Sequence, residues 1–178
     1  MAQAARVSVF SVGDVFPDIP DGRASFAPLE PLFARADCHH HSLRGIELHR
    51  GKPIFYGLGT LIHHCTSIKT SPAGRATREA RFGERSSFAA AEEFPLFPFR
   101  ADARRTGIAV TDLHADGTIE TGLIPAMILA DGATEPLRAD DQRAAEVADY
   151  VERLRAQSGF ATRFERATLG EWLLLKAV

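Results

Sequence analysis

The chain has 178 residues, of which 45% are hydrophobic and 25% are charged, and its formal net charge is -2 at pH 7. This composition is typical of a soluble globular protein with one domain and a sizeable core. The near-neutral balance gives no reason to expect nucleic acid or an anionic membrane as a partner, and we interpret the basic run 100–105 as a solvated loop.

The sequence favours a cytoplasmic location. The N-terminal run MAQAARVSVFSVGDVF has a short apolar stretch broken by Ser8, Ser11 and Gly13, which is unlike a signal peptide. No apolar run approaches the roughly 20 residues that a membrane helix needs. With two cysteines, Cys38 and Cys65, reduced thiols or metal ligands are expected rather than a disulfide framework.

The predicted elements begin with a buried strand at Val7–Val12, which is apolar and ends at Gly13. Ser25 then caps a short predicted helix with four apolar side chains at helical spacing, namely Phe26, Leu29, Leu32 and Phe33. The turn HRGKP separates an alternating run from an apolar one, so we expect Ser42–His49 to pair antiparallel with Pro53–Thr60.

The second half of the chain predicts a second hairpin. Thr106–Leu113 and Thr118–Leu129 are apolar runs that flank an Asp-Gly turn, and Pro125 indicates that the later strand lies at an edge or is interrupted there. Between the two hairpins, the aromatic run FPLFPF cannot be a central strand because of its two prolines. It is interpreted as a flap over a core or a partner.

A long helix and two closing strands complete the predicted chain. Asp140 or Asp141 caps the helix, which runs to about Gln157 with an apolar stripe, and Gly159 is a natural stop. The closing strands are predicted at Phe160–Glu165 and Trp172–Val178.

The histidines gather in one region of the chain. Six of the seven fall within residues 35–65, together with both cysteines. On an extended segment His39 and His41 point the same way, because side chains alternate along a strand, so two imidazoles can share a cation or flank a phosphate. The HHC run at 63–65 could add ligands, although its spacing matches no zinc-finger pattern.

Asp14 is the other candidate ligand. It follows a glycine just beyond the first predicted strand, where α/β folds commonly place a metal-binding carboxylate. The plainer interpretation, that Asp14 caps the loop, stays open.

Two stretches carry a family resemblance. VFSVGDVFPDIPD followed by SFAPLEPLFARAD, and later HHHSLRGIELHRGKPIFYGLGTLI, resemble the opening and the late HPH, RGIE and GKPIFYSLGNF motifs of the bacterial capsule and poly-γ-glutamate synthesis proteins. This CapA-like family is similar to the calcineurin-like metallophosphatases. The resemblance implies that Asp14, His39 and His41 are metal ligands and that the two histidines act in catalysis. His40 stands where proline is usual, and Thr60 where asparagine is usual.

The resemblance covers the two ends of a longer domain. The family has NxE, NNH and further histidine motifs between these stretches, whereas here FARAD meets CHHHSLRG directly and the chain contains no asparagine. We therefore expect residues 1–178 to form a single, internally shortened CapA-like domain with a junction near 37–38. A two-metal phosphoesterase holds its cations about 3.5–4 Å apart with many ligands, so one aspartate and two histidines predict an incomplete, inactive centre.

The expected fold class is α/β (α+β in some schemes), a partial metallophosphatase-like mixed-sheet sandwich with C-terminal antiparallel hairpins and one long helix. The resemblance implies a metal-dependent phosphoesterase-like hydrolase that uses a divalent metal (Mn, Fe or Zn) on a phosphorylated or polymeric substrate. It also implies that some members are membrane-associated or exported. Two alternatives are a non-catalytic remnant or interaction module, and a small His/Cys zinc-binding module at Cys38–Cys65. Oligomerisation is left open.

Overall fold

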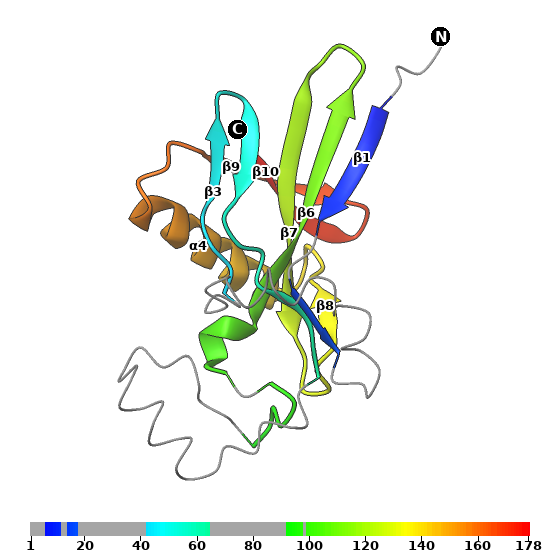
Figure 1. The fold of residues 1–178 in the computed structure, drawn as a ribbon, viewed down its shortest axis with the longest axis vertical. Helices are drawn as coiled ribbons and strands as arrows, with labels where there is room; N and C mark the ends of the chain where they lie inside the picture. The colour runs from blue at the N-terminus through cyan, green and yellow to red at the C-terminus, as the bar shows by residue number, and fades with distance from the viewer. Residues whose placement is uncertain (1–5, 12–13, 18–41, 65–91, 98) are drawn as a thin grey trace, which may run out of the picture.

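The computed structural model describes residues 6–11, 14–17, 42–64, 92–97 and 99–178 of the chain (Figure 1). Its strands are β1 (Arg6–Ser11), β2 (Asp14–Pro17), β3 (Ile46–His49), β4 (Lys52–Phe55), β5 (Thr60–His64), β6 (Arg105–His114), β7 (Ile119–Ile128), β8 (Thr134–Pro136), β9 (Phe164–Leu169) and β10 (Trp172–Ala177). The helices are the short 3-10 helix η3 (Ala101–Arg104) and the long helix α4 (Gln142–Gln157). The helix predicted after Ser25 lies outside the described residues.

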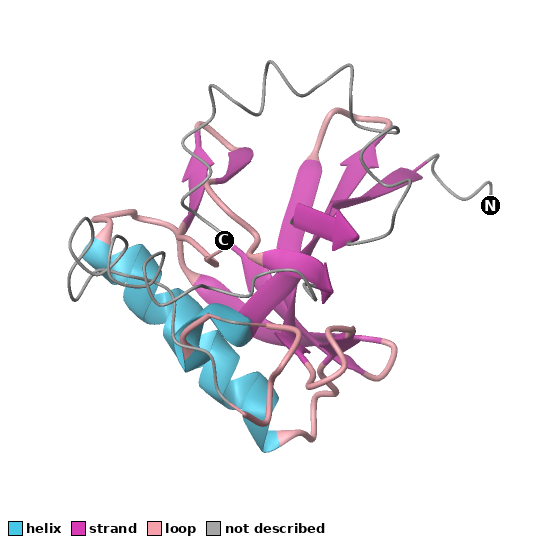
Figure 2. Ribbon diagram, turned by 60° about the horizontal axis from the view of Figure 1, so that its bottom comes forward, coloured by secondary structure: helices cyan, strands magenta, loops and turns pink. Residues whose placement is uncertain are grey.

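One antiparallel sheet organises the described part of the chain. Its six strands follow the order β1-β6-β7-β10-β9, and β8 pairs with β7 beside this path. The hairpin β3–β4 and the parallel pair β2–β5 form two small sheets next to it. Helix α4 lies along one face of the strands (Figure 2). The mixture of strands, C-terminal hairpins and one long helix confirms the α/β (α+β) class expected from the sequence.

Both predicted hairpins form. In β6–β7 the register runs from Arg105 opposite Met127 to Leu113 opposite Ile119. In β3–β4, Ile46 lies opposite Phe55. An isolated bridge between Leu43 and Leu58 extends the β3–β4 hairpin beyond its ladder. Residues that alternate in polarity on both sides of a glycine-containing turn pair in this way because the turn fixes their register.

Pro125 marks a change of neighbour along β7. The strand is internal rather than an edge: it pairs with β6 on one side and with β10 and then β8 on the other. The β10 ladder reaches Leu123, the β8 ladder begins at Ala126, and between them the carbonyl of Pro125 accepts from the N–H of Leu137 at 2.9 Å. Proline, which has no backbone N–H, fits this junction because neither the β10 ladder nor the β8 ladder needs an N–H donor at this position.

The first strand is not buried as predicted. β1 pairs antiparallel with β6 and is the first strand in the order of the sheet, at its edge. Val7 is 61% exposed and Val9 is 42% exposed. Alternation and apolar content identify a strand correctly, but they cannot tell an edge position from a central one, because that depends on which distant strands pair with it.

The main core forms between α4 and the sheet. Asp141 caps the helix, and the last turn is followed by Gly159 at a φ of +71°. The core residues are Leu43, Ile46, Leu123, Leu137, Ala144, Val147, Ala148, Val151, Leu173 and Leu175. They come from the apolar stripe of the helix and from four separate stretches of the chain. The helix is therefore held mainly by packing, as is usual for a helix of this length.

The predicted closing strands need one correction. β10 forms as expected, but β9 begins at Phe164 rather than at Phe160. The preceding residues anchor the end of the helix instead: Arg155 Nη1 donates to the carbonyl of Phe160 at 3.1 Å. Thr162 Oγ1 accepts from the N–H of Leu48 at 2.8 Å. Arg163 is the first residue of this segment to bond to the end of the chain, through two backbone bonds with Val178 at 2.9 Å.

The FPLFPF run lies over a small second core. Phe97 is fully buried against Ala103 and Ile128, with Phe94 and Phe99 packed around them. The rings of Phe97 and Phe99 meet edge to face, with centroids 5.1 Å apart. This arrangement confirms the interpretation of the run as a flap over a core.

The helices within the described ranges are too short or too polar to cross a membrane.

Candidate functional site

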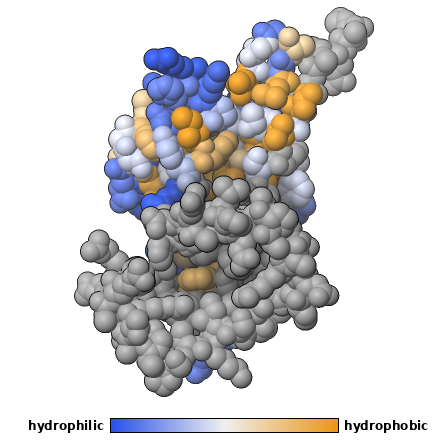
Figure 3. Space-filling model, in the orientation of Figure 1, coloured by the Kyte–Doolittle hydropathy of each residue, from blue (hydrophilic) through white to orange (hydrophobic). Residues whose placement is uncertain are grey.

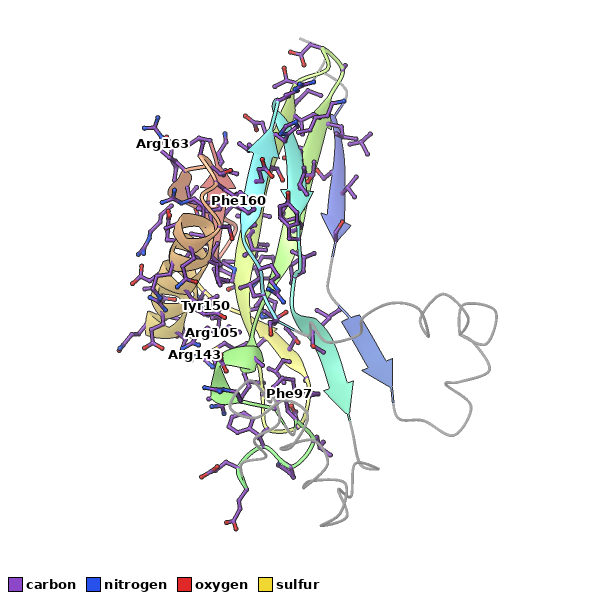
Figure 4. All side chains as sticks on the ribbon, turned by 60° about the vertical axis from the view of Figure 1, so that its left-hand side comes forward. Phe97, Arg105, Arg143, Tyr150, Phe160 and Arg163 are labelled. Atoms are coloured by element: carbon purple, nitrogen blue, oxygen red, sulfur yellow. The ribbon has the colours of Figure 1, made fainter. Side chains whose placement is uncertain are left out.

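Asp14 and Thr60 lie opposite each other at the start of the parallel ladder between β2 and β5. Asp14 is the first residue of β2, just beyond the end of β1, as expected of a carboxylate after the first strand. The register then shifts, and β2 continues beside the backbone of His63 and His64. Figure 4 shows these two strands side by side at the lower right. The described parts of the two stretches that carry the resemblance, 14–17 and 60–62, are thus neighbours in space.

Thr60 is buried, and its hydroxyl finds no hydrogen-bonding partner among the residues that the structure describes. Its exposed fraction is 0%, and its Oγ1 is unpaired within those ranges. A buried hydroxyl left unpaired costs about 1–3 kcal/mol, so such positions are uncommon in native structures. This hydroxyl is the one polar group of the described residues that is both unpaired and placed next to Asp14 in the ladder.

The segment before Thr60 is fixed onto β6. The carbonyl of Leu58 accepts from the N–H of Gly107 at 3.0 Å and from Thr106 Oγ1 at 2.8 Å. Gly59 has a φ of +84°, and a Cβ at this position would lie 3.0 Å from the Cα of Thr106. Glycine is therefore required twice, for the backbone conformation and for the close approach. This contact sets where β5, and with it Thr60, begins.

The histidine part of the predicted site lies outside the described residues. This holds for His39 and His41, and for Cys38 and Cys65 of the zinc alternative. The prediction that Asp14 faces a cavity shared with His39 and His41 therefore remains a prediction. Within the described ranges no group of three or more His, Cys, Asp and Glu side chains is close enough to hold a metal. Those residues by themselves do not supply the donors of a two-metal centre.

Two other histidines are the last residues of their strands, His49 of β3 and His114 of β6, next to the hairpin turns. Figure 1 shows these two turns at the top of the molecule. His49 is exposed, as predicted, with its Nδ1 3.5 Å from Glu47 Oε1. Glu47 also accepts from the hydroxyl of Tyr56 at 2.7 Å, and this bond raises the pKa of Tyr56. His114 Nε2 is buried 3.6 Å from Glu120 Oε2, beyond hydrogen-bonding distance.

A cluster of arginines around Tyr150 was not expected from the sequence. Arg105 lies with its Cζ 4.9 Å from the centre of the Tyr150 ring, and Arg153 with its Cζ at 5.7 Å. Figure 4 labels Tyr150 and Arg105 where α4 meets the start of β6. Burial is the main cause that raises the pKa of Tyr150, so its phenol stays neutral. The guanidinium groups are stabilised by the electrostatic attraction of the ring face.

The interpretation of residues 100–105 as a solvated loop is therefore wrong in part. Arg104 Cζ lies 3.7 Å from the centre of the Phe94 ring, and Arg105 packs on Tyr150. One sequence feature could have suggested these contacts: aromatic residues occur both before and after the basic run. Their spacing in the sequence does not identify which ring each arginine meets.

No family model matches the chain, and a search of curated proteins finds no match either.

Proposed function

We propose that this chain is a CapA-like protein of the metallophosphatase superfamily, associated with capsule or poly-γ-glutamate biosynthesis, with an incomplete metal site. The observation that carries the proposal is the pairing of Asp14 with Thr60. The opening stretch and the late motif each resemble the family in sequence, and they lie far apart along the chain. A shared site requires these stretches to be neighbours, and the β2–β5 ladder makes them so.

The unpaired Thr60 hydroxyl supports the same assignment. The resemblance places an asparagine at this position, and an amide offers a carbonyl oxygen and two N–H donors where threonine offers one hydroxyl. If the neighbouring polar residues of the family's site are missing here, a buried side chain such as that of Thr60 keeps a hydroxyl group without a hydrogen-bonding partner. Asp14, His39 and His41 would then be what remains of the metal ligands.

A centre of this kind is not expected to turn over substrate. Two-metal hydrolysis of phosphate esters uses one cation to activate water and both to stabilise the phosphoryl oxygens. One carboxylate and two imidazoles can hold at most one metal ion, and only loosely. When residues act together in catalysis, removing one of them lowers the reaction rate by orders of magnitude. We expect a phosphorylated or polymeric substrate class, inherited with the fold, and little or no catalysis.

The test measures metal binding and hydrolysis on the same samples. Manganese binding is followed by isothermal titration, and hydrolysis of bis(p-nitrophenyl) phosphate is assayed with manganese or zinc supplied. We expect weak binding of one ion, a loss of at least about tenfold in affinity in Asp14→Ala and His41→Ala, and hydrolysis near the background rate. Robust turnover abolished by both substitutions would show that the centre is complete.

The alternative of a non-catalytic interaction module has one observation in its favour. The core around α4, as far as the described residues show it, is built from residues between Leu43 and Leu175. Metal binding that is absent from the wild type and from both variants would favour this alternative. The zinc-module alternative predicts one tightly bound zinc, measured by mass spectrometry, that is lost in Cys38→Ser and unaffected in Asp14→Ala.

A further inference from the structure

β1 lies at an edge of the sheet with no described strand on its outer side, and two of its exposed side chains, Val7 and Val9, are apolar. Val7, Val9 and Leu113 are among the most exposed large apolar residues of the described chain. Val7 lies opposite Leu113 in the β1–β6 ladder, so these side chains share one face. Figure 3 shows apolar residues gathered at the upper right, where β1 and the β6–β7 hairpin reach beyond α4. No other described strand pairs with this edge.

The hydrogen-bonding pattern of β1 can be read from its neighbours. The N–H of His114 donates to Thr118 O at 2.9 Å, so His114 bonds toward β7. Its neighbour Leu113 therefore bonds toward β1, where it meets Val7. Since bonding alternates along an antiparallel ladder, the backbone groups of Arg6, Ser8 and Phe10 point away from β6.

We propose that β1 pairs with β1 of a second copy of this chain, antiparallel and about a two-fold axis at Ser8. In this register the outward groups of Ser8 meet those of the partner's Ser8, and those of Arg6 meet those of the partner's Phe10. Each of these residues donates one bond and accepts one. The two sheets then form one continuous sheet across the dimer, with no unpaired edge between them.

The side chains favour the same register. With Ser8 at the axis, Val7 lies beside the partner's Val9, and Val9 beside the partner's Val7. Both pairs fall on the face that carries Leu113, so an exposed apolar strip on each copy becomes one shared cluster. Apolar β-branched residues directly opposite each other across two strands stabilise their pairing.

The opposite edge of the sheet shows what a protected edge looks like in this chain. β9 carries exposed Glu165 and Arg166, and Arg166 Nη2 pairs with Asp149 at 2.6 Å. Charged residues on an edge strand discourage pairing with another chain. β1 carries one charged residue, Arg6 at its start, and from Val7 to Ser11 it has no charge, no proline and no register irregularity. The two-fold pairing is therefore assigned to β1 and not to β9.

The test is sedimentation equilibrium of the whole chain over a concentration series. We expect a reversible monomer–dimer equilibrium that Ser8→Pro weakens at least about tenfold. Proline removes the outward N–H at the axis, and an edge strand tolerates it where the N–H faces solvent. Ser8→Ala is the matched control, since it removes the hydroxyl that bonds to Asp112 but keeps the backbone donor. It should leave the equilibrium unchanged.

A second pair of variants guards against loss of folding. Val7→Lys with Val9→Lys places like charges opposite each other across the axis and should give monomers. Ile54→Lys, an exposed apolar residue on β4, should leave the dimer intact. Circular dichroism verifies that each variant is folded, and the lysine variants decide if Ser8→Pro unfolds. A wild type that is monomeric throughout, or a dimer unaffected by the β1 changes, would overturn the proposal. Metal binding does not enter, so this test is independent of the proposed function.

Discussion

Asp14 and Thr60 are paired across a parallel ladder although β3 and β4 lie between them in the chain. The Thr60 hydroxyl is buried and has no hydrogen-bonding partner in the described part of the chain. The ladder joins β2, which begins at Asp14, to β5, which follows Gly59. The segment at Gly59 is itself fixed onto β6. These contacts together fix where the backbone of Asp14 lies relative to Thr60.

Thr60→Val should stabilise the protein by about 1 kcal/mol, because valine keeps the shape and removes a buried unpaired hydroxyl. Thr106→Val is the matched control: Thr106 is equally buried, but its Oγ1 donates to the carbonyl of Leu58 at 2.8 Å. That substitution should destabilise by about 1 kcal/mol. Urea unfolding of both variants measures the difference. Equal losses in the two would mean that the Thr60 hydroxyl has a partner.

Gly59→Ala should destabilise the protein by more than about 2 kcal/mol, because a Cβ there meets the backbone of Thr106 as well as an unfavourable φ. Gly117→Ala separates these effects. Its φ of +85° is within a degree of that of Gly59, but nothing lies within 4 Å of the added Cβ. A loss of about 1 kcal/mol is expected from the backbone conformation alone. Thermal unfolding compares the two, and losses of similar size would show that the contact with β6 is not tight.

Asp141→Ala should destabilise the protein by about 1 kcal/mol, because Asp141 Oδ1 accepts from the N–H of Arg143 at 2.8 Å at the start of α4. Asp140→Ala is the control, since this neighbour has an 80% exposed side chain and makes a surface contact with Arg138. Its removal should change the stability little. Both variants are compared by urea unfolding at neutral pH.

The same residue predicts a pH dependence. The hydrogen bonds from Arg143, first from its guanidinium and then from its N–H, hold the pKa of Asp141 below its ordinary value of 3.8. A carboxyl whose pKa is lower in the folded state stabilises the fold above pH 3.8 and loses that contribution as the pH falls through the folded value. The gap in stability between wild type and Asp141→Ala should therefore be constant near neutrality and should close in acid. A gap that persists at low pH would contradict this assignment.

Phe97→Ala should destabilise the protein by about 3–5 kcal/mol, because the side chain is fully buried in the small core with Ala103 and Ile128. Tyr56→Phe is a mild control at an aromatic that is 54% exposed. Differential scanning calorimetry would show the Phe97 loss as a lower midpoint of the main transition, since Ile128 belongs to β7 of the large sheet. A separate, earlier transition would show instead that the small core unfolds on its own.

Local structure could be predicted from the sequence because its causes are local. The Asp-Gly turn set the register of β6–β7, and the cap at Asp141 with the stripe of Val147 and Val151 set the limits of α4. The HRGKP turn did the same for β3–β4. Each of these depends on residues only a few positions apart, whose spacing matches the period of a strand or a helix.

Long-range pairing was decided by the tertiary structure. β1 was identified as a strand, but its exposed edge position follows from its pairing with β6, about a hundred residues later. Asp14 was identified as a candidate ligand, but its place opposite Thr60 follows from a parallel ladder that no local pattern encodes. The contact of Arg105 with Tyr150 is of the same kind. Periodicity fixes which face of a segment is apolar, whereas the choice of neighbour depends on the free energy of the whole packed sheet.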